Sequence, residues 1–219
     1  STEGVARLSA GVFGFFIRER AGVIGKTLDG SRRPFVAIIG GAKVSSKIMV
    51  IRNLARKVDT LIIGGGMVYT FLKAQGIEVG KSLVEDKFIE AAKGIWAELK
   101  ALHNFKLIIP VDVLVAAEAV PGASSEVVPI DRIPMDRMGL DIGPKSVELF
   151  KEAIRTAGTV IWNGPLGVFE IKEFAGGTNE IAVALASSKA GTSIGGGDSA
   201  SAAEQAGVAD RITHISTGG

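Results

Sequence analysis

The 219-residue sequence contains no cysteine, which excludes disulfides, thiolate metal sites and a cysteine nucleophile. Histidine is scarce: His103 and His214 are the only two, and neither has a ligand or triad partner at a recognisable spacing. Long apolar runs are also missing, because the best candidate, 107–120, is interrupted by a proline and two acidic residues. The net charge of only +2 gives little reason to expect a nucleic-acid-binding surface. The composition therefore predicts neither a membrane protein nor a nucleic-acid binder.

Apolar residues and glycine, by contrast, are abundant. Hydrophobic residues make up 47% of the chain and the mean hydropathy is +0.33. Such richness is typical of parallel sheets, whose strands are buried on both faces. Six short aliphatic or β-branched runs alternate with longer amphipathic stretches, which favours βαβ units. We therefore expect an α/β, doubly wound, Rossmann-like fold with a six-stranded parallel sheet and helices on both faces.

The boundaries of these elements follow from the pattern. The expected strands cover 34–40, 59–64, 105–110, 159–163, 191–195 and 212–216. The expected helices cover 42–58, 67–74, 85–103, 145–157, 178–189 and 199–207. The segment 117–140, with three prolines, is expected to form an irregular excursion containing a small hairpin.

Glycine is clustered where the expected strands end. Pairs or triplets follow five of them, at 40–41, 64–66, 164 with 167, 195–197 and 218–219. The carboxyl ends of parallel strands form one edge of the sheet, where ligands bind. Glycine allows a close backbone approach there, and the helix N-termini that follow attract anions. Ordinary tight turns would need about one glycine each, so the repetition favours a ligand-lined edge.

Two common nucleotide motifs fail. Gly25-Lys26-Thr27 ends like a Walker A loop, but Arg20 stands where that loop requires glycine. The segment 195–200 satisfies a loose GxGxxA pattern, yet no acidic residue follows about 20 positions later to bind a ribose. A nicotinamide-dependent oxidoreductase is therefore disfavoured.

Charged side chains beside the glycines suggest phosphate chemistry. Lys43 and Lys47 are spaced i,i+4 at the start of an expected helix, so they should share a face beside its N-terminus. Cations in that place suit phosphoryl transfer, although solvated surface lysines are the alternative. Asp198 is either a helix cap or an oxygen ligand for Mg²⁺. Glu170, at the end of a rigid Gly/Pro loop, either contacts a ribose or caps the next element.

Five motifs together resemble the phosphoglycerate kinases. They are GGAKV at 40–44, GGGMVYTF at 64–71, WNGPLGVFE at 162–170, GGGDS at 195–199 and the terminal STGG. The resemblance assigns 33–219 to the C-terminal, nucleotide-binding domain and 1–32 to a lead-in and inter-domain connection. AKVSSK and MVYTF resemble the kinetoplastid members of the family. Because the chain begins without Met and ends just after a strand-like run, we expect a fragment of a longer two-domain protein.

The resemblance implies a reaction and its partners. A phosphoryl group would pass between 1,3-bisphosphoglycerate and ADP to give 3-phosphoglycerate and ATP, with Mg²⁺ accompanying the ADP or ATP. The N-terminal domain that binds 3-phosphoglycerate would be missing, so the fragment alone should be inactive. The complete enzyme is expected to be a monomer without nucleic-acid or membrane partners. A cytoplasmic location is expected, or a glycosomal one for a kinetoplastid enzyme.

The resemblance also implies residue roles. Lys43 would follow the transferring phosphoryl group, and Gly197, Gly218 and Gly219 would complete the catalytic set. Lys47 and Asn163 would contact phosphate, and Asp198 would be the Mg²⁺ ligand. The other nucleotide-binding residues would be Gly40, Gly195, Gly196 and Ser199 near the phosphates, Pro165 and Glu170 at the ribose, and Gly65, Gly66, Tyr69, Leu83, Gly139, Leu140 and Val168 around the adenine.

Two residues depart from the family pattern. Ser46 stands where many members have aspartate, and Tyr69 replaces the more usual phenylalanine beside the adenine. A regulatory or scaffold domain that binds a nucleotide without chemistry is the main alternative. Lys43 argues against it, since binding alone needs no second cation beyond the one at the α-phosphate.

Overall fold

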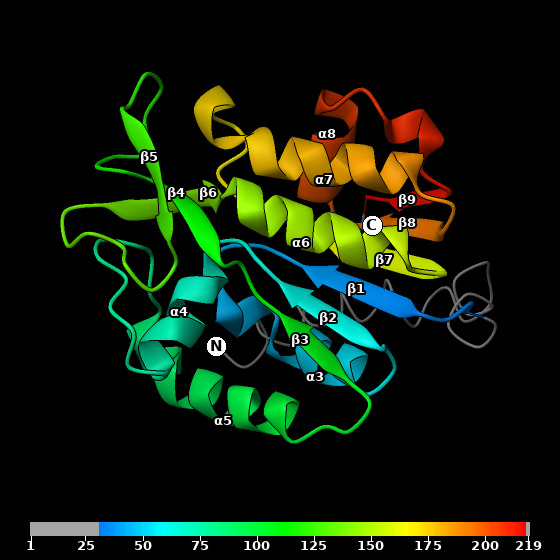
Figure 1. Ribbon diagram of the computed structural model, residues 1–219, viewed down its shortest axis with the longest axis horizontal. Helices are drawn as coiled ribbons and strands as arrows, with labels where there is room; N and C mark the ends of the chain where they lie inside the picture. Colours follow the sequence, from blue (N-terminus) through cyan, green and yellow to red (C-terminus); the bar gives the residue numbers. More distant parts are fainter. Residues whose placement is uncertain (1–30, 218–219) are drawn as a thin grey trace.

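The structure, a computed structural model, describes residues 31–217. Within them a six-stranded parallel sheet runs in the order β3-β2-β1-β7-β8-β9 (Figure 1), which confirms the predicted fold class. The strands of this sheet are β1 (Phe35–Ile39), β2 (Thr60–Ile63), β3 (Lys106–Ile108), β7 (Thr159–Asn163), β8 (Gly191–Gly195) and β9 (His214–Ser216). Each lies within a run expected from the sequence.

Helices cover both faces of this sheet, with α3, α4 and α5 on one side and α6, α7 and α8 on the other (Figure 1). The α-helices are α3 (Ile48–Ala55), α4 (Met67–Ala74), α5 (Ile89–Lys100), α6 (Pro144–Arg155), α7 (Gly176–Ser187) and α8 (Gly197–Gln205). Short 3-10 turns are η2 (Val44–Ser46), η3 (Asp86–Phe88), η4 (Lys172–Phe174) and η5 (Ala209–Arg211).

Strand β1 shows why the sequence is so apolar. Phe35, Ala37 and Ile39 pack with the helices on one face, while Val36 and Ile38 pack with those on the other. All five residues are at most 1% exposed. A central strand of a parallel sheet has no solvent face, so both alternating sets must be apolar.

The register places the strand ends level with one another. Ile39 pairs with Ile63 of β2 and with Asn163 of β7. Asn163 in turn pairs with Gly195 of β8, and Gly195 pairs with Ser216 of β9. The loops that leave these strands therefore start side by side at one edge of the sheet.

The excursion expected over 117–140 is wrong in its extent. A second, three-stranded antiparallel sheet has the order β5-β4-β6 and is built from β4 (Asp112–Ala116), β5 (Ser125–Pro129) and β6 (Met138–Ile142). It begins before the expected excursion and ends after it. Its inner strand β4 buries Val113 and Val115 in the same core as β1.

A tertiary contact holds this second sheet in place. The Asp112 carboxylate accepts hydrogen bonds from the backbone N–H groups of Lys145 (3.0 Å) and Ser146 (2.8 Å). Strand β4 thereby caps the N-terminus of α6, where a negative charge is favourable. Because this cap comes from more than 30 residues away, no local sequence signal reports it.

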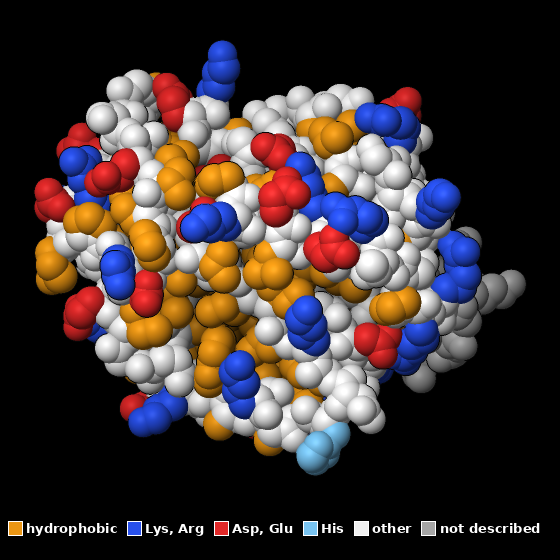
Figure 2. Space-filling model, in the orientation of Figure 1, with side chains coloured by type: hydrophobic (Ala, Val, Ile, Leu, Met, Phe, Trp, Pro, Cys, Tyr) orange, Lys and Arg blue, Asp and Glu red, His pale blue; other side chains and the backbone are white. Residues whose placement is uncertain are grey.

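The surface carries mixed charges. Figure 2 shows Lys and Arg side chains interspersed with Asp and Glu across the face that it presents, with apolar side chains between them. None of the helices within 31–217 combines the length and the hydropathy needed to cross a lipid bilayer.

Candidate functional site

Loops from three strands pack on one another at the carboxyl edge of the large sheet. The backbone N–H of Gly40 donates to the carbonyl of Asn163 (2.8 Å), and that of Gly41 donates to the carbonyl of Pro165 (2.9 Å). The N–H of Met67, in the first turn of α4, donates to the carbonyl of Gly41 (3.1 Å). Three of the motifs singled out in the sequence thus form one continuous surface.

The glycines of these loops serve two purposes. A Cβ at Gly40 would lie 2.2 Å from the Pro165 carbonyl oxygen, and one at Gly65 would lie 2.6 Å from backbone atoms of the first loop. These glycines are required because the protein's own loops touch there. Among the described residues, a Cβ at Gly197 would meet nothing closer than the Thr217 carbonyl oxygen at 4.0 Å. Gly197, unlike Gly40 and Gly65, is therefore not required by packing against another described loop.

The prediction that Lys43 and Lys47 share one helical face is wrong. Lys43 is extended (φ −123°, ψ 122°) and precedes the turn η2, while α3 begins only at Ile48. The turn forms because Val44 is fully buried in the core and because Ser45 is bound by a glutamate from another loop. The two ammonium groups consequently occupy different settings.

Lys47 is held in place, whereas Lys43 is not. The Lys47 Nζ donates a hydrogen bond to Oδ1 of the buried Asn163. Burial lowers the pKa of Lys47 from its ordinary value, and the nearby Asp198 carboxylate acts in the opposite direction. Among the residues described, the exposed Lys43 ammonium has neither a hydrogen bond nor an ion pair. No side chain within 31–217 therefore competes with an anion for this ammonium.

Asp198 lies in the first turn of α8, behind Gly196, which is the N-cap and has a φ of +92°. Its side chain is exposed and makes no hydrogen bond within 31–217, so the helix-cap alternative is not what this structure shows. The neighbouring Ser199 is fully buried, and its Oγ accepts a hydrogen bond from the N–H of Gly164 (2.6 Å). Ser199 therefore orients the loop after β7 and does not reach the surface.

The residues predicted around the adenine meet where β6 approaches α4. The N–H of Val168 donates to the carbonyl of Leu140 (2.8 Å), and a Cβ at Gly139 would lie 1.9 Å from the Tyr69 hydroxyl. Gly139 thus makes room for the tyrosine ring, whose burial raises the pKa of its phenol. Leu83 is 50% exposed and Val168 is half-buried, so this part of the edge presents an apolar wall.

The predicted residues divide by exposure. Within 31–217, those buried in this structure are Gly40, Tyr69, Leu140, Asn163, Gly195 and Ser199. Those that reach the surface are Lys43, Lys47, Gly65, Gly66, Leu83, Gly139, Pro165, Val168, Glu170, Gly196, Gly197 and Asp198. The predicted catalytic glycines Gly218 and Gly219 lie outside the described residues.

Glu170 resembles Asp198 in having a carboxylate without a hydrogen bond in the part of the chain that the structure describes. It is exposed at the end of the loop after β7, and within 31–217 it makes no hydrogen bond. The next turn, η4, has Ile171 at its N-cap and no side-chain cap, so Glu170 does not cap it. No group of three or more His, Cys, Asp or Glu in the described residues could hold a metal by itself. Any cation here would need ligand oxygens as well.

Sequence reasoning missed Asp141, a 4% exposed residue of β6. Its carboxylate accepts hydrogen bonds from the N–H groups of Gly177 (2.8 Å) and Ile142 (2.8 Å). Burial nevertheless raises the pKa of Asp141 to about 7. The two hydrogen bonds lower this pKa, and the Glu180 carboxylate raises it further. A single carboxylate inside an apolar strand gives no recognisable signal in the sequence.

Asp141 should make stability depend on pH. A carboxyl group whose pKa is raised on folding stabilises the protein fully below its unfolded pKa, and this contribution is lost as pH rises through 7. Between pH 4 and pH 8 the loss should reach about 4 kcal/mol at most. In Asp141→Asn the pH-dependent part should disappear, although one N–H loses its acceptor and the variant is less stable at low pH. Urea unfolding at pH 5, 6.5 and 8 measures this.

The exposed Asp131→Asn replacement is the control, and its curve should run parallel to that of the parent. If the Asp141→Asn and parent stabilities also ran parallel with pH, the carboxyl would not be titrating in this range.

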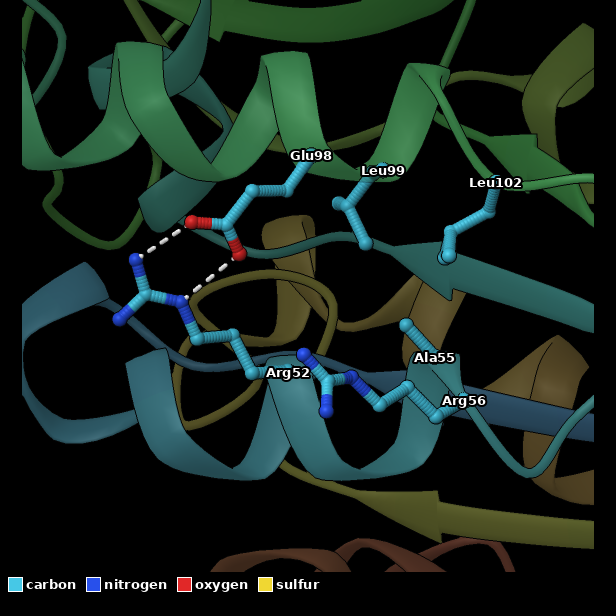
Figure 3. Close-up of a pocket in the computed structure, with 6 residues that line it drawn as sticks. All are labelled: Arg52, Ala55, Arg56, Glu98, Leu99 and Leu102. Atoms are coloured by element: carbon cyan, nitrogen blue, oxygen red, sulfur yellow. Dashed lines mark hydrogen bonds and ion pairs between the residues drawn. The ribbon is translucent and has the colours of Figure 1, made fainter.

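A groove between α3 and α5, of about 240 Å³, lies away from this edge (Figure 3). Its lining residues are Arg52, Ala55, Arg56, Glu98, Leu99 and Leu102. The Arg52 guanidinium donates to both oxygens of Glu98 (3.0 and 2.8 Å), which lowers the pKa of that exposed carboxylate. Exposed pairs of this kind contribute little to stability. None of the residues predicted to bind a ligand lines the groove.

Comparison with known protein families identifies the family of this chain. The phosphoglycerate kinase family model matches residues 1–219 of the chain. The chain belongs to the phosphoglycerate kinase family. A phosphoglycerate kinase from Pelotomaculum thermopropionicum is 54% identical over the whole chain, and one from Clostridium novyi is 53% identical.

Solved structures agree with this assignment. The structure of phosphoglycerate kinase from Coxiella burnetii matches 89% of the chain with a TM-score of 0.85 and 41% identity. The Pyrococcus horikoshii phosphoglycerate kinase structure matches 94% with a TM-score of 0.78 and 28% identity. None of the four relatives named here is a kinetoplastid enzyme, so the predicted kinetoplastid origin has no support from them.

The match covers only part of each relative. The chain spans 56% of the Pelotomaculum phosphoglycerate kinase and 55% of the Clostridium one. It likewise covers 50% of the Coxiella chain and 52% of the Pyrococcus chain. The chain therefore corresponds to about half the length of a phosphoglycerate kinase.

Proposed function

We propose that this chain is the nucleotide-binding half of a glycolytic phosphoglycerate kinase, which transfers a phosphoryl group between 1,3-bisphosphoglycerate and ADP. The observation that carries the proposal is the presence of a cation and an anion without hydrogen-bond partners among the described residues at the sheet edge. Within 31–217 the Lys43 ammonium has no hydrogen bond or ion pair and the exposed Asp198 carboxylate has no hydrogen bond. Lys47, whose charge the Asp198 carboxylate favours, is already bound to Asn163. A nucleotide with its cation supplies both missing partners at once.

Each group then has a task in the reaction. In the ATP-forming direction, the bond between the acyl oxygen and phosphorus breaks while an ADP β-phosphate oxygen forms the new bond. Lys47 binds the nucleotide phosphates in one place, because its ammonium is fixed by Asn163. Lys43 stabilises the charge on the group in transfer, since its free ammonium can follow that group. The wall near Leu83 and Val168 receives the flat face of the adenine ring.

Mg²⁺ fits this site as a companion of the nucleotide. It binds proteins through one or two carboxylates together with substrate phosphates, and it keeps several waters. Asp198 is one exposed carboxylate in the first turn of α8, and it makes no competing hydrogen bond with any described residue. When bound, Mg²⁺ neutralises phosphate charge. Asp198 would hold it, and Lys47 opposite would keep the phosphates within reach.

The half-length match supports a proposal about the rest of the enzyme. We propose that residues 33–219 form the nucleotide-binding domain and 1–32 its connection to a domain that binds 3-phosphoglycerate. The relatives are about twice as long as this chain, which supports a missing partner domain. We place the enzyme in the cytoplasm as a monomer, in keeping with a glycolytic role.

A thermal shift measurement on the chain tests the nucleotide proposal. Saturation with MgADP at a hundredfold excess over Kd should add about 2.7 kcal/mol to the free energy of unfolding. Asp198→Asn should lose most of the Mg²⁺-dependent part of this shift and keep the shift produced by ADP with EDTA. The chain alone should form no ATP from 1,3-bisphosphoglycerate, because the two reactants cannot be held in line.

The matched control is Asp210→Asn, which should bind MgADP like the parent, because Asp210 is an acidic residue of η5 outside the predicted site. No shift with any adenine nucleotide would refute the binding proposal. Sustained ATP formation by the chain alone would refute the claim that it holds half of an active site.

A further inference from the structure

Glu85 joins two parts of the edge that are 40 residues apart. Its Oε1 accepts a hydrogen bond from the Ser45 hydroxyl (2.6 Å), and its Oε2 accepts one from the Ser45 backbone N–H (3.1 Å). Both carboxylate oxygens are therefore committed to one residue. Hydrogen bonds to an ionised acceptor are the stronger kind, and two from the same residue also fix its orientation.

The glutamate is itself anchored to the core. Its backbone N–H donates to Oγ1 of Thr70 (3.1 Å), and Thr70 is a 1% exposed residue of α4. The clamp, defined as Ser45, Thr70 and Glu85, thus ties an otherwise open loop to a buried helix. On the other side of the clamp, Leu83 belongs to the apolar wall, only two residues before Glu85.

The clamp lies midway between the two lysines. Ser45 is two residues after Lys43 and two residues before Lys47. The Ser46 hydroxyl donates to the Lys43 carbonyl (2.9 Å), so the backbone on both sides of Ser45 is held. The Lys47 ammonium has an anchor of its own in Asn163, whereas the Lys43 ammonium has none within 31–217. Losing the clamp should therefore displace Lys43 more than Lys47.

We propose that Glu85 is a positioning residue for phosphoryl transfer: it holds the loop of Lys43 at a set distance from the apolar wall at Leu83 and Val168. This inference rests on the proposed kinase function. A displacement of about 1 Å in a group that contacts the reacting atoms can cost up to about a hundredfold in rate. Because Glu85 acts through Lys43, it should affect the chemical step more than nucleotide binding.

The test uses the full-length enzyme with 1,3-bisphosphoglycerate and MgADP. Glu85→Ala should lower kcat by about 10- to 100-fold and raise the KM for MgADP by less than about threefold. Glu85→Gln should restore most of the activity, because its amide can accept from the N–H and still bond the hydroxyl of Ser45. The control is Glu90→Ala, which should have unchanged kcat and KM. Glu90 is an exposed residue in the first turn of α5, and its carboxylate makes no hydrogen bond within 31–217.

A double-mutant cycle separates positioning from general destabilisation. If Glu85 acts through Lys43, Lys43→Ala with Glu85→Ala should be no slower than Lys43→Ala alone. The inference would be overturned if the kcat losses of the two single variants multiplied in the double variant, or if Glu85→Gln lost as much kcat as Glu85→Ala. Either result would leave the kinase function standing. An inactive parent enzyme, or a Lys43→Ala variant with full activity, would instead overturn the proposed function or the role of Lys43 on which the inference depends.

Discussion

Lys43→Ala in the full-length enzyme is expected to lower kcat at least about 100-fold while changing MgADP affinity less than about tenfold. The reason is that Lys43 is the cation at this edge without a partner in the described residues, whereas Lys47 is held by Asn163. Only an interaction that is stronger in the transition state than in the ground state accelerates the chemistry. Steady-state kinetics together with titration of MgADP measures the two effects separately.

Lys57→Ala is the matched control, since Lys57 is an exposed lysine just beyond the other end of α3. It should change neither kcat nor affinity. Equal losses of kcat and of MgADP affinity in Lys43→Ala would assign Lys43 to nucleotide binding and not to the transfer step.

Gly40→Ala is expected to destabilise the protein by about 4 kcal/mol or more, or to prevent folding. The new Cβ would lie 2.2 Å from the Pro165 carbonyl oxygen and 2.4 Å from that of Gly164. Both are backbone atoms of the loop after β7, and the N–H of Gly40 already bonds the end of that strand. The loops cannot separate without breaking the edge, so urea unfolding of the chain should show the loss directly.

Gly94→Ala supplies the opposite expectation for the same chemical change. Gly94 is exposed within α5, and a Cβ there meets nothing within 4 Å. Alanine in a helix interior is favoured over glycine by about 0.5–1 kcal/mol, so this variant should be more stable than the parent. If Gly40→Ala and Gly94→Ala lost the same stability, contact with the loop after β7 would not explain why glycine is required at position 40.

Much of the fold could be predicted because its signals are local. A buried parallel strand such as β1 must be apolar on both faces, and each helix must present one apolar side, so composition and period report the elements directly. The clustering of glycines at the strand ends predicted a ligand-lined edge, whereas the structure shows that Gly40 and Gly65 are required by contacts between the protein's own loops. The second sheet was missed because its outer strands carry no continuous apolar run: β5 is almost wholly exposed, and β6 contains Gly139 and Asp141. The contact of Asp112 with α6 also spans a long sequence separation.

The sequence by itself determined the parallel α/β sheet, the family and the identity of the motifs at its carboxyl edge, since these depend on runs of neighbouring residues. Only the tertiary structure decided which glycines serve the packing of loops, that Lys43 and Lys47 do not share a helix, that Glu85 binds the loop of Lys43, and that Asp141 is buried against the start of α7. The physical reason is that burial, close backbone approach and carboxylate hydrogen bonds arise between residues distant in the chain. Such contacts exist only after the sheet has brought the strand ends level.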